Sequence, residues 1–271
     1  MAIPANFIFS QSNLQDYREC PRRFELRHLK RQRWPAVESE PVMEQERRMQ
    51  QGERFHQLVQ QHQLGLPLQQ VQAMITDPEL GDWWQNYLDC PPANLPAQRY
   101  PEFTLTAAFA GYRVLAKYDL LAVQPGRRAV IVDWKTSRKA QKLSHLEGRM
   151  QTRLYPLLLV LAGAGLNDQK PVLPGGVEMI YWFACEPQNP VQIEYSERQF
   201  YEDQSELFNL IQEISACRRF DETAVEKTCQ YCAYRSLCGR GETAGVRPEE
   251  EDEDSGGLAG FDFDQAGELT F

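Results

Sequence analysis

A carboxylate and an ammonium group close an apolar run near the middle of the chain. Residues 129–132 (Ala-Val-Ile-Val) read as a strand covered on both faces, and Asp133-Trp134-Lys135 follow directly. Because side chains alternate along a strand, Asp133 and Lys135 point to one face and Trp134 to the other. Two interpretations are open. The pair is either an ion pair that caps the strand, or a cation-binding carboxylate beside a lysine that acts on whatever the cation binds.

Two further residues have side chains suited to the same cation. Asp119 lies in the middle strand of an expected antiparallel meander whose last strand carries Asp133. Adjacent strands lie about 5 Å apart, so the two carboxylates can meet, and a divalent cation is the usual remedy for their repulsion. His56 follows Gly52 by one helical turn. A helical histidine is by default an ordinary polar residue, but Gly52 beside it would leave room for an ion.

The cysteines give a separate metal signal. Cys229, Cys232 and Cys238 form a CxxC pair followed by a third thiol six residues later, a spacing typical of a metal site. The chain has seven cysteines, an odd number that disfavours a disulfide framework. A zinc ion or an iron–sulfur cubane needs a fourth ligand, and the candidates are Cys20, Cys90, Cys185 and Cys217. Cys20 is the best of them, because the last two lie in apolar patterns typical of core thiols.

Hydrophobic periodicity predicts the elements that position these residues. We expect helices over 13–29, broken at Cys20-Pro21 and capped by Ser12, and over 43–63, 69–90, 146–162 and 196–217. We expect strands over 7–10, 102–109, 112–123, 129–135, 177–184 and 191–195. Gln151 and Tyr155 lie four residues apart on one face of the helix 146–162. This order of elements predicts an α/β fold with a central mixed sheet flanked by helices.

Composition narrows the class of protein. The chain of 271 residues has a formal net charge of -9, but residues 248–271 hold nine acidic residues and no basic one, so the body is neutral. A neutral body with local basic clusters such as Arg22-Arg23 does not exclude a polyanionic ligand. There is no long apolar run and no leader pattern, so we expect a soluble, unexported, cytoplasmic protein with no membrane partner.

Taken in order, these motifs resemble the PD-(D/E)XK nuclease superfamily. The resemblance is to RecB-family exonucleases with a [4Fe-4S] cluster, as in AddB and the CRISPR-associated exonucleases of spacer acquisition. The matching pieces are the segment Ser10 to Phe24 with its Cys20-Pro21-Arg22-Arg23, Gly52-x3-His56, Asp119, Asp133-x-Lys135, Gln151-x3-Tyr155 and the three C-terminal cysteines. They span residues 10–238. Each motif is weak alone except the cysteines, but the ordered set is highly specific.

The resemblance implies a fold and a domain plan. It implies a restriction-endonuclease-like nuclease domain over 1–245, with a helical N-terminal part at 12–95. The catalytic sheet and helix follow at 100–195, and a C-terminal helix and cysteine loop at 196–245. The segment 246–271 would be a disordered acidic tail.

The resemblance also implies a role for each candidate residue. His56, Asp119, Asp133 and the backbone carbonyl of Trp134 would bind Mg2+ or Mn2+. Lys135 would orient or deprotonate the attacking water, or offset charge on the phosphate, while Gln151 and Tyr155 would position the strand or the lysine. The cofactor ligands would be Cys20, Cys229, Cys232 and Cys238. They would hold a [4Fe-4S] cluster, with zinc as the alternative, and so join the N- and C-terminal segments.

Two functions follow from the resemblance. The first is a metal-dependent DNA exonuclease acting on single-stranded or frayed ends in DNA repair, recombination or CRISPR-related processing. The alternative is a nuclease-like DNA-binding accessory subunit with little activity of its own. No GxxxxGK[ST] loop occurs, so the chain works alone or beside a separate helicase. The tail is either a solubilising segment or a peptide that docks on a DNA-maintenance partner or on the chain's own DNA groove.

Overall fold

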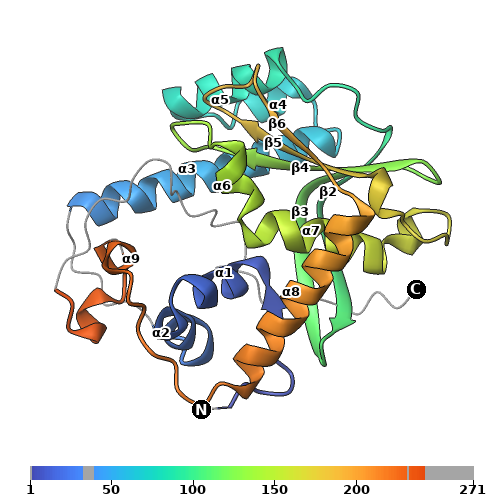
Figure 1. The fold of residues 1–271 in the computed structure, drawn as a ribbon. Helices are drawn as coiled ribbons and strands as arrows, with labels where there is room; N and C mark the ends of the chain where they lie inside the picture. Colours follow the sequence, from blue (N-terminus) through green and yellow to red (C-terminus); the bar gives the residue numbers. More distant parts are fainter. Residues whose placement is uncertain (1, 33–39, 231, 242–271) are drawn as a thin grey trace.

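The structure is a computed structural model that describes residues 2–32, 40–230 and 232–241. Its centre is a six-stranded mixed sheet with the order β1-β3-β4-β5-β6, and β2 pairs with β3. The strands are β1 (Ile8–Ser10), β2 (Gln98–Phe109), β3 (Tyr112–Gln124), β4 (Arg128–Lys135), β5 (Val177–Phe183) and β6 (Val191–Glu194). The prediction of an α/β fold with a mixed sheet flanked by helices is confirmed (Figure 1). The acidic tail predicted over 246–271 lies outside the described residues.

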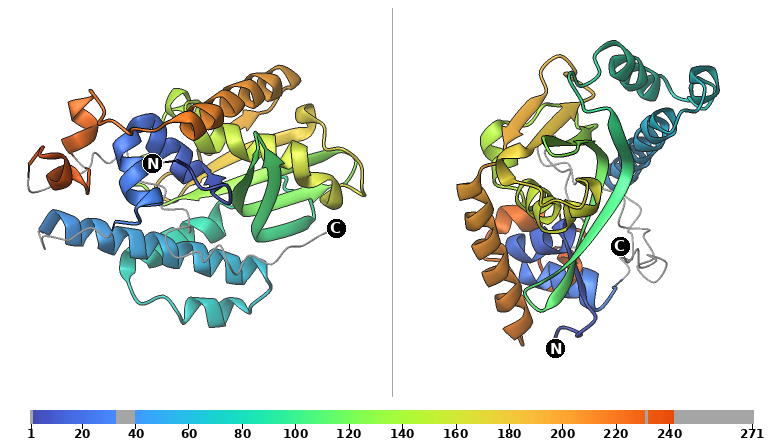
Figure 2. Two further views of the ribbon diagram at one scale, coloured as in Figure 1. Left: turned by 90° about the horizontal axis from the view of Figure 1, so that it is seen from below. Right: turned by 90° about the vertical axis from the view of Figure 1, so that its right-hand side faces the viewer.

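Helices cover both faces of this sheet. On one face lie α3 (Glu40–Gln63), α4 (Leu68–Gln72) and α5 (Pro78–Asp89), and on the other α1 (Gln11–Glu19), α7 (Met150–Ala162) and α8 (Glu197–Ala216) (Figures 1 and 2). The short helices are α2 (Pro21–Phe24), η1 (Glu25–Leu29), α6 (Leu143–Glu147), η2 (Gly163–Leu166), η3 (Pro174–Gly176), α9 (Glu226–Gln230) and η4 (Arg235–Cys238). None of the helices in the described part of the chain combines the length and apolar character needed to cross a membrane.

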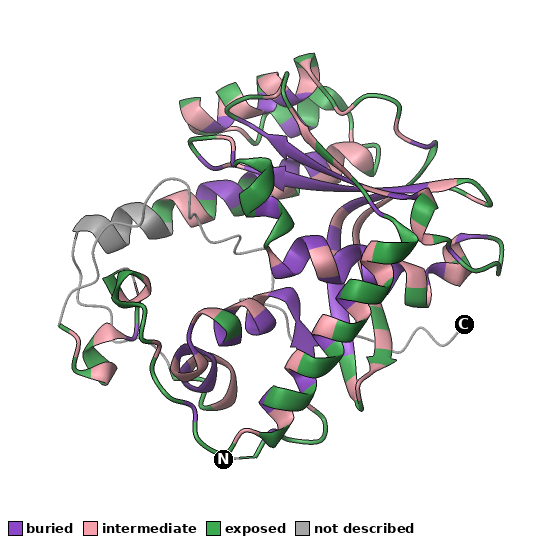
Figure 3. Ribbon diagram, viewed as in Figure 1, coloured by how far each residue is buried: buried purple, intermediate pink, exposed green. Residues whose placement is uncertain are grey.

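Strand β4 shows why the sheet needs both layers. Val130, Val132 and Trp134 pack against the α3 layer, while Ala129 and Ile131 pack against the α7 layer. Period-two alternation of apolar residues on both faces is expected of a strand buried between helices, and β4 pairs with β5 in parallel. The centre of the sheet is accordingly buried (Figure 3).

The long strand β3 has two different neighbours along one edge. Strand β2 pairs with β3 along nearly all of its length. The other edge is shared, because β1 pairs with residues 113–115 and β4 with residues 120–124. Residues 116–119 therefore lie between the two partner strands. Asp119 is the last residue of this interval, next to the first residue that pairs with β4.

The first helix begins earlier than the sequence suggests. Its N-cap is Ser10, not Ser12: Ser10 Oγ accepts from Asn13 N at 3.5 Å, and Asn13 Oδ1 accepts from Ser10 N at 3.0 Å. The predicted cap is wrong because Ser10 and Asn13 form a complete capping box, which places Ser12 inside the helix. Gln15 Oε1 accepts from Met150 N, the first residue of α7, at 3.1 Å.

Two helices predicted as continuous are divided. The predicted helix 69–90 is α4 and α5, because Asp77 caps a new helix that has Pro78 at its first position. The predicted helix 146–162 is α6 and α7, which meet at Gly148-Arg149. The predicted break at Cys20-Pro21 is confirmed, since α1 ends at Glu19 and α2 begins at Pro21.

Candidate active site

The alternation of β3 inverts at Asp119. Tyr118 packs with the α7 layer, whereas Leu120 packs with the α3 layer. In an uninterrupted strand these two side chains would share a face. The inversion occurs in the interval of β3 that lies between β1 and β4. Asp119 is therefore placed where the sheet opens, rather than inside either apolar layer.

Glu102 stands opposite Asp119 at this inversion. Pairs Pro101–Leu120 and Phe103–Tyr118 flank the two acids, so they face each other across the β2–β3 hairpin. Glu102 has φ 52°, a left-handed backbone that non-glycine residues seldom adopt. Such conformations cost energy and cluster at functional sites.

The imidazole of His56 joins these two acids. His56 Nδ1 lies 3.3 Å from Asp119 Oδ1. His56, Glu102 and Asp119 each offer one ligand atom, and the three atoms lie within 4.8 Å of one another. One nitrogen and two carboxylate oxygens suit a divalent ion that keeps open positions for water and phosphate. The predicted meeting of His56 with an acid of the sheet is therefore confirmed by this distance.

Glu102 is the residue that sequence reasoning missed. Burial, and then the charge of Asp119, raise the pKa of Glu102 above its usual value, while Lys117 opposes the shift. The sequence did contain a signal that Glu102 faces Asp119. Phe109 pairs with Tyr112 across the turn, and counting seven residues outward on each side reaches Glu102 and Asp119. An expected hairpin therefore implied that two acids face each other.

Asp133, Lys135 and Gln151 form a second, buried group. Lys135 Nζ lies 2.7 Å from Asp133 Oδ2 and donates to Gln151 Oε1 at 3.1 Å, while Gln151 Nε2 donates to Asp133 Oδ1. The three residues are only 2–5% exposed. Asp133 does not belong to the His56 group; its carboxylate is held by the lysine and the amide. Helix α7 supplies Gln151, as predicted, and so closes the group.

One hydrogen bond links the two groups. Asp119 Oδ2 accepts from Trp134 N at 2.8 Å, and Trp134 lies between Asp133 and Lys135 in the chain. The backbone pairing of β3 with β4 ends at Leu120 and Val132, so this ladder does not pair the N–H group of Trp134. The Asp119 carboxylate accepts from that N–H group instead. The proposed role of the Trp134 carbonyl as a ligand stays a prediction.

Two tyrosines on the α7 side of the sheet pack against residues of the site or next to it. The Tyr181 ring lies under Lys135, with Nζ 5.4 Å from its centroid, and sequence reasoning did not select it. The Tyr155 ring packs against Tyr118 at a centroid distance of 5.0 Å, and Tyr118 OH donates to the Tyr155 carbonyl. Tyr155 thus supports the residue that precedes Asp119, and its predicted role in positioning the lysine or the strand stays a prediction.

Comparison with known proteins now identifies the family. The profile of the PD-(D/E)XK nuclease superfamily matches residues 8–239. The chain belongs to the PD-(D/E)XK nuclease superfamily. This nuclease is similar to the solved structure of SSO0001, at 15% identity over 87% of each chain with a TM-score of 0.44. It is also similar to a candidate exonuclease from Eubacterium rectale, at 9% identity over 80% of this chain and 85% of that chain with a TM-score of 0.46. No curated protein sequence matches.

Gly52 lets α3 of this nuclease approach the end of β4 closely. A Cβ atom at Gly52 would lie 2.9 Å from Thr136 Oγ1, closer than such contacts allow. Thr136 directly follows Lys135, and His56 lies one turn after Gly52 on α3. Gly52 therefore sets the distance between α3 and the end of β4, and its predicted role of leaving room for an ion beside His56 stays a prediction.

Replacing Gly52 should separate site geometry from stability. Gly52→Ala is expected to weaken Mn2+ binding about tenfold, the effect of disturbing a residue that orients a ligand. Alanine favours helix over glycine by about 1 kcal/mol, but the contact with Thr136 opposes this gain, so the Tm should rise only when Thr136 is also replaced. Thr136→Ala removes the obstructing oxygen, so the double variant should recover most of the lost affinity. Calorimetric Mn2+ titration and thermal melts of both single variants and the double variant check this. Equal loss in the single and double variants would contradict the contact.

The four candidate cysteines lie in one neighbourhood of the nuclease. Burial first, and then the charges of Cys20 and Cys229, raise the pKa of Cys232. Burial, the Glu222 carboxylate, Cys232 and Cys20 raise the pKa of Cys238 to about 11. Within the described residues, however, no three cysteine sulfurs lie within 4.8 Å of one another. A zinc ion would hold them about 3.8 Å apart, whereas a cubane accepts sulfurs that are more widely spaced.

Cations and a short loop surround these thiols. Arg240 Nη1 donates to Cys229 Sγ at 3.0 Å, and Arg23 lowers the pKa of Cys232 in opposition to burial. Arg23 is fixed by Asp16, whose carboxylate lies 2.8 Å away. Positive charge beside the sulfurs stabilises their thiolate forms, which are the forms that bind metals. The donor set therefore suits a group bound by thiolates.

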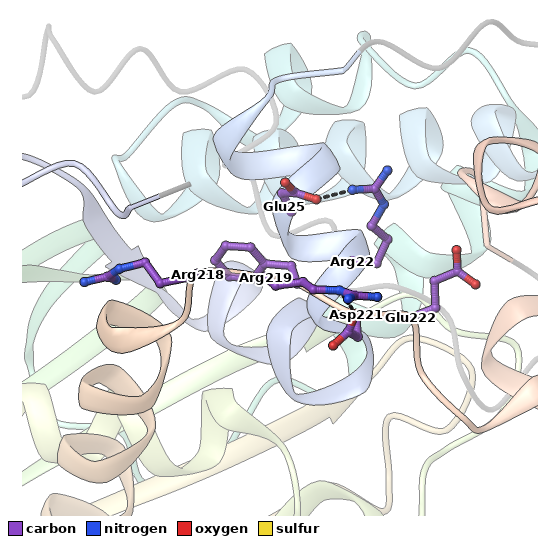
Figure 4. A pocket seen from close by; sticks show the side chains of 7 residues that line it. Arg22, Glu25, Arg218, Arg219, Asp221 and Glu222 are labelled. Atoms are coloured by element: carbon purple, nitrogen blue, oxygen red, sulfur yellow. Dashed lines mark hydrogen bonds and ion pairs between the residues drawn. The ribbon is translucent and has the colours of Figure 1, made fainter.

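A surface pocket of about 470 Å³ lies between the segments 22–25 and 218–222 (Figure 4). It is lined by Arg22, Glu25, Arg218, Arg219, Phe220, Asp221 and Glu222. Two of its arginines are paired inside it, Arg22 with Glu25 and Arg219 with Asp221. None of the predicted site residues lines the pocket, and its size gives no reason to place the chemistry there.

Proposed function

We propose that the protein is a metal-dependent DNA exonuclease of the RecB type. One observation carries the proposal: the His56–Asp119–Glu102 group lies one peptide unit, through Trp134 N, from the Asp133–Lys135 pair. A cation-binding group beside a buried, oriented lysine has the parts that phosphodiester hydrolysis requires. Membership of the superfamily supports nuclease chemistry. The proposal adds three things: cleavage from the ends of the DNA chain, a preference for single-stranded or frayed DNA ends, and a role in repair, recombination or CRISPR-related processing.

His56 and Asp119 would hold Mg2+ or Mn2+. Asp133 and the Trp134 carbonyl, which lie in the adjoining buried group, would complete the ligand set once the ion is bound. When bound, the ion supplies a Lewis acid and an acidified water. Lys135 is fixed by two acceptors, Asp133 and Gln151, so we assign it the role of a positive charge that offsets charge developing on the phosphate. Gln151 is hydrogen-bonded to both Asp133 and Lys135 and restrains the orientation of these two side chains. Tyr155 supports Tyr118, beside Asp119, from α7.

The segment after Lys135 offers a path for the nucleic acid. Residues 136–150 leave the site at Lys135 and return to it at Gln151. Arg138, Lys139 and Lys142 are exposed on this segment, which contains a single acidic residue, Glu147. Such a surplus of cations, in a chain of net charge -9, suits contact with DNA phosphates. A helicase or DNA-maintenance partner, reached through the acidic tail, belongs to the same proposal.

We further propose that Cys20, Cys229, Cys232 and Cys238 hold a [4Fe-4S] cluster. The influence of Cys20 on the pKa of Cys232 and of Cys238, and of Cys229 on that of Cys232, supports a shared site, and the CxxC spacing favours a thiolate-bound cluster. The group would tie α1 and α2 to the segment 225–241. Its function is structural, because none of the four thiols belongs to the His56 group or to the Asp133–Lys135–Gln151 group.

The test is digestion of end-labelled single-stranded DNA with Mg2+ or Mn2+. Wild-type protein should release labelled nucleotides, EDTA should stop the reaction, and Asp119→Asn should reduce the rate at least about 100-fold. Asp82→Asn, an exposed acid on α5, is the matched control and should keep full activity. A circular single strand should resist digestion. Equal activity of wild type and Asp119→Asn, with intact DNA binding, would instead support the accessory-subunit function.

A further inference from the structure

Glu102 and Asp119 form a like-charged pair that needs a counter-ion. Their side chains are 15% and 12% exposed, and they face each other directly across the β2–β3 hairpin. Opposed like charges destabilise an antiparallel pair. In the structure Lys117 provides the compensation: its Nζ lies 2.5 Å from Glu102 Oε2, and it precedes Asp119 by two residues on the same strand.

A divalent ion would compete with this lysine. The ligand atoms of His56, Glu102 and Asp119 lie within 4.8 Å of one another, and ligands of Mg2+ at about 2.1 Å are at most about 4.2 Å apart. A small contraction would therefore bring all three onto one ion. The ammonium of Lys117 would then face a dication beside the same carboxylate, and that arrangement is repulsive. Lys117 is 23% exposed on a flexible stem, so it can turn toward solvent.

We propose that Lys117 is an internal counter-ion which the divalent cation displaces, and that Glu102 then becomes a ligand of that cation. The inference rests on the proposed cation site and extends it by two residues. Glu102 is an added ligand from a strand that carries none of the predicted site residues. Lys117 is a positioning residue: it holds Glu102 toward Asp119 before loading and lowers the affinity for the ion.

Mn2+ titration of the DNA-free protein tests both parts of the proposal, the ligand role of Glu102 and the counter-ion role of Lys117. Glu102→Gln should weaken Mn2+ binding about tenfold, because a charged ligand is lost. Lys117→Met should strengthen it about tenfold, the order expected when one unit charge is removed near a dication in a partly solvated site. Lys117→Arg keeps the charge and should stay near wild type.

Thermal melts give an independent readout. In EDTA, Lys117→Met should melt below wild type, because two carboxylates face each other without a counter-ion, and Mn2+ should raise its Tm more than that of wild type. Glu102→Gln should melt no lower than wild type in EDTA. If Lys117→Met does not fold, the variant Glu102→Gln with Lys117→Met removes both charges; it should fold and bind Mn2+ more tightly than Glu102→Gln.

The outcomes separate this inference from the proposed function. If wild type and Asp119→Asn bind Mn2+ equally, the proposed cation site itself is wrong. If Asp119→Asn loses Mn2+ but Glu102→Gln binds as tightly as wild type, only the role of Glu102 is overturned. Unchanged or weaker Mn2+ binding in Lys117→Met overturns the displacement.

Discussion

Lys135→Met should lower the single-turnover rate of DNA cleavage about 1000-fold without weakening Mn2+ binding at the His56 group. Lys135 is 5% exposed and its Nζ is fixed by Asp133 and Gln151. A pre-oriented charge in a buried site contributes about two to three orders of magnitude to rate when it faces charge that develops in the transition state. Methionine retains the volume and apolar stem of lysine but not the ammonium.

The same substitution leaves the Asp133 carboxylate without its ion-pair partner. Breaking a buried ion pair from one side costs about 3–5 kcal/mol, so Lys135→Met should also melt well below wild type. Asp133→Asn with Lys135→Met removes both charges and should recover most of that stability without recovering cleavage. Lys170→Met, an exposed lysine, is the control and should be neutral in both assays. Cleavage by Lys135→Met within tenfold of the wild-type rate would remove Lys135 from the mechanism.

The parts of the site that follow strand and helix periodicity could be predicted. Alternation along β4 placed Asp133 and Lys135 on one face, and four-residue spacing placed Gln151 on the side of α7 that meets them. These relations are local, because each depends on one element and its period. They therefore survived small errors in the expected ends of the elements, such as the division of the helix 146–162.

Relations that depend on packing could not be predicted in this way. Glu102 belongs to the site because its backbone is left-handed and because the side-chain alternation of β3 inverts opposite it. Neither feature follows from the regular side-chain periodicity of a strand. The contact of Gly52 with Thr136 depends on how closely α3 crosses β4. The contact of Gln15 with the first residue of α7, 135 residues away, likewise depends on how α1 packs. Sequence spacing gives candidate partners, and tertiary structure decides between them.

Removing one cysteine should release the C-terminal segment from the body of the protein. Helices α9 and η4 contain no buried residue, and Tyr234, which lies between them, is buried and donates from its OH to Gln32 O at 3.3 Å. Burial of one tyrosine contributes little against the entropy of ordering the segment, whereas a metal group bound by four thiolates contributes on the order of 10 kcal/mol. The proposed cluster is thus the main attachment of residues 225–241.

Cys20→Ala and Cys232→Ala should therefore give the same result, although the two residues lie in different parts of the chain. Anaerobically purified wild type should be brown and contain iron, and both variants should lose the colour and the iron and be cleaved by protease between residues 217 and 241. Cys185→Ala, an exposed thiol outside the set, should keep all three properties. A brown, protease-resistant Cys20→Ala protein would exclude Cys20 as a ligand. A colourless wild type that contains zinc would replace the cubane with a single ion, and the sulfurs would then have to move closer together than the structure places them.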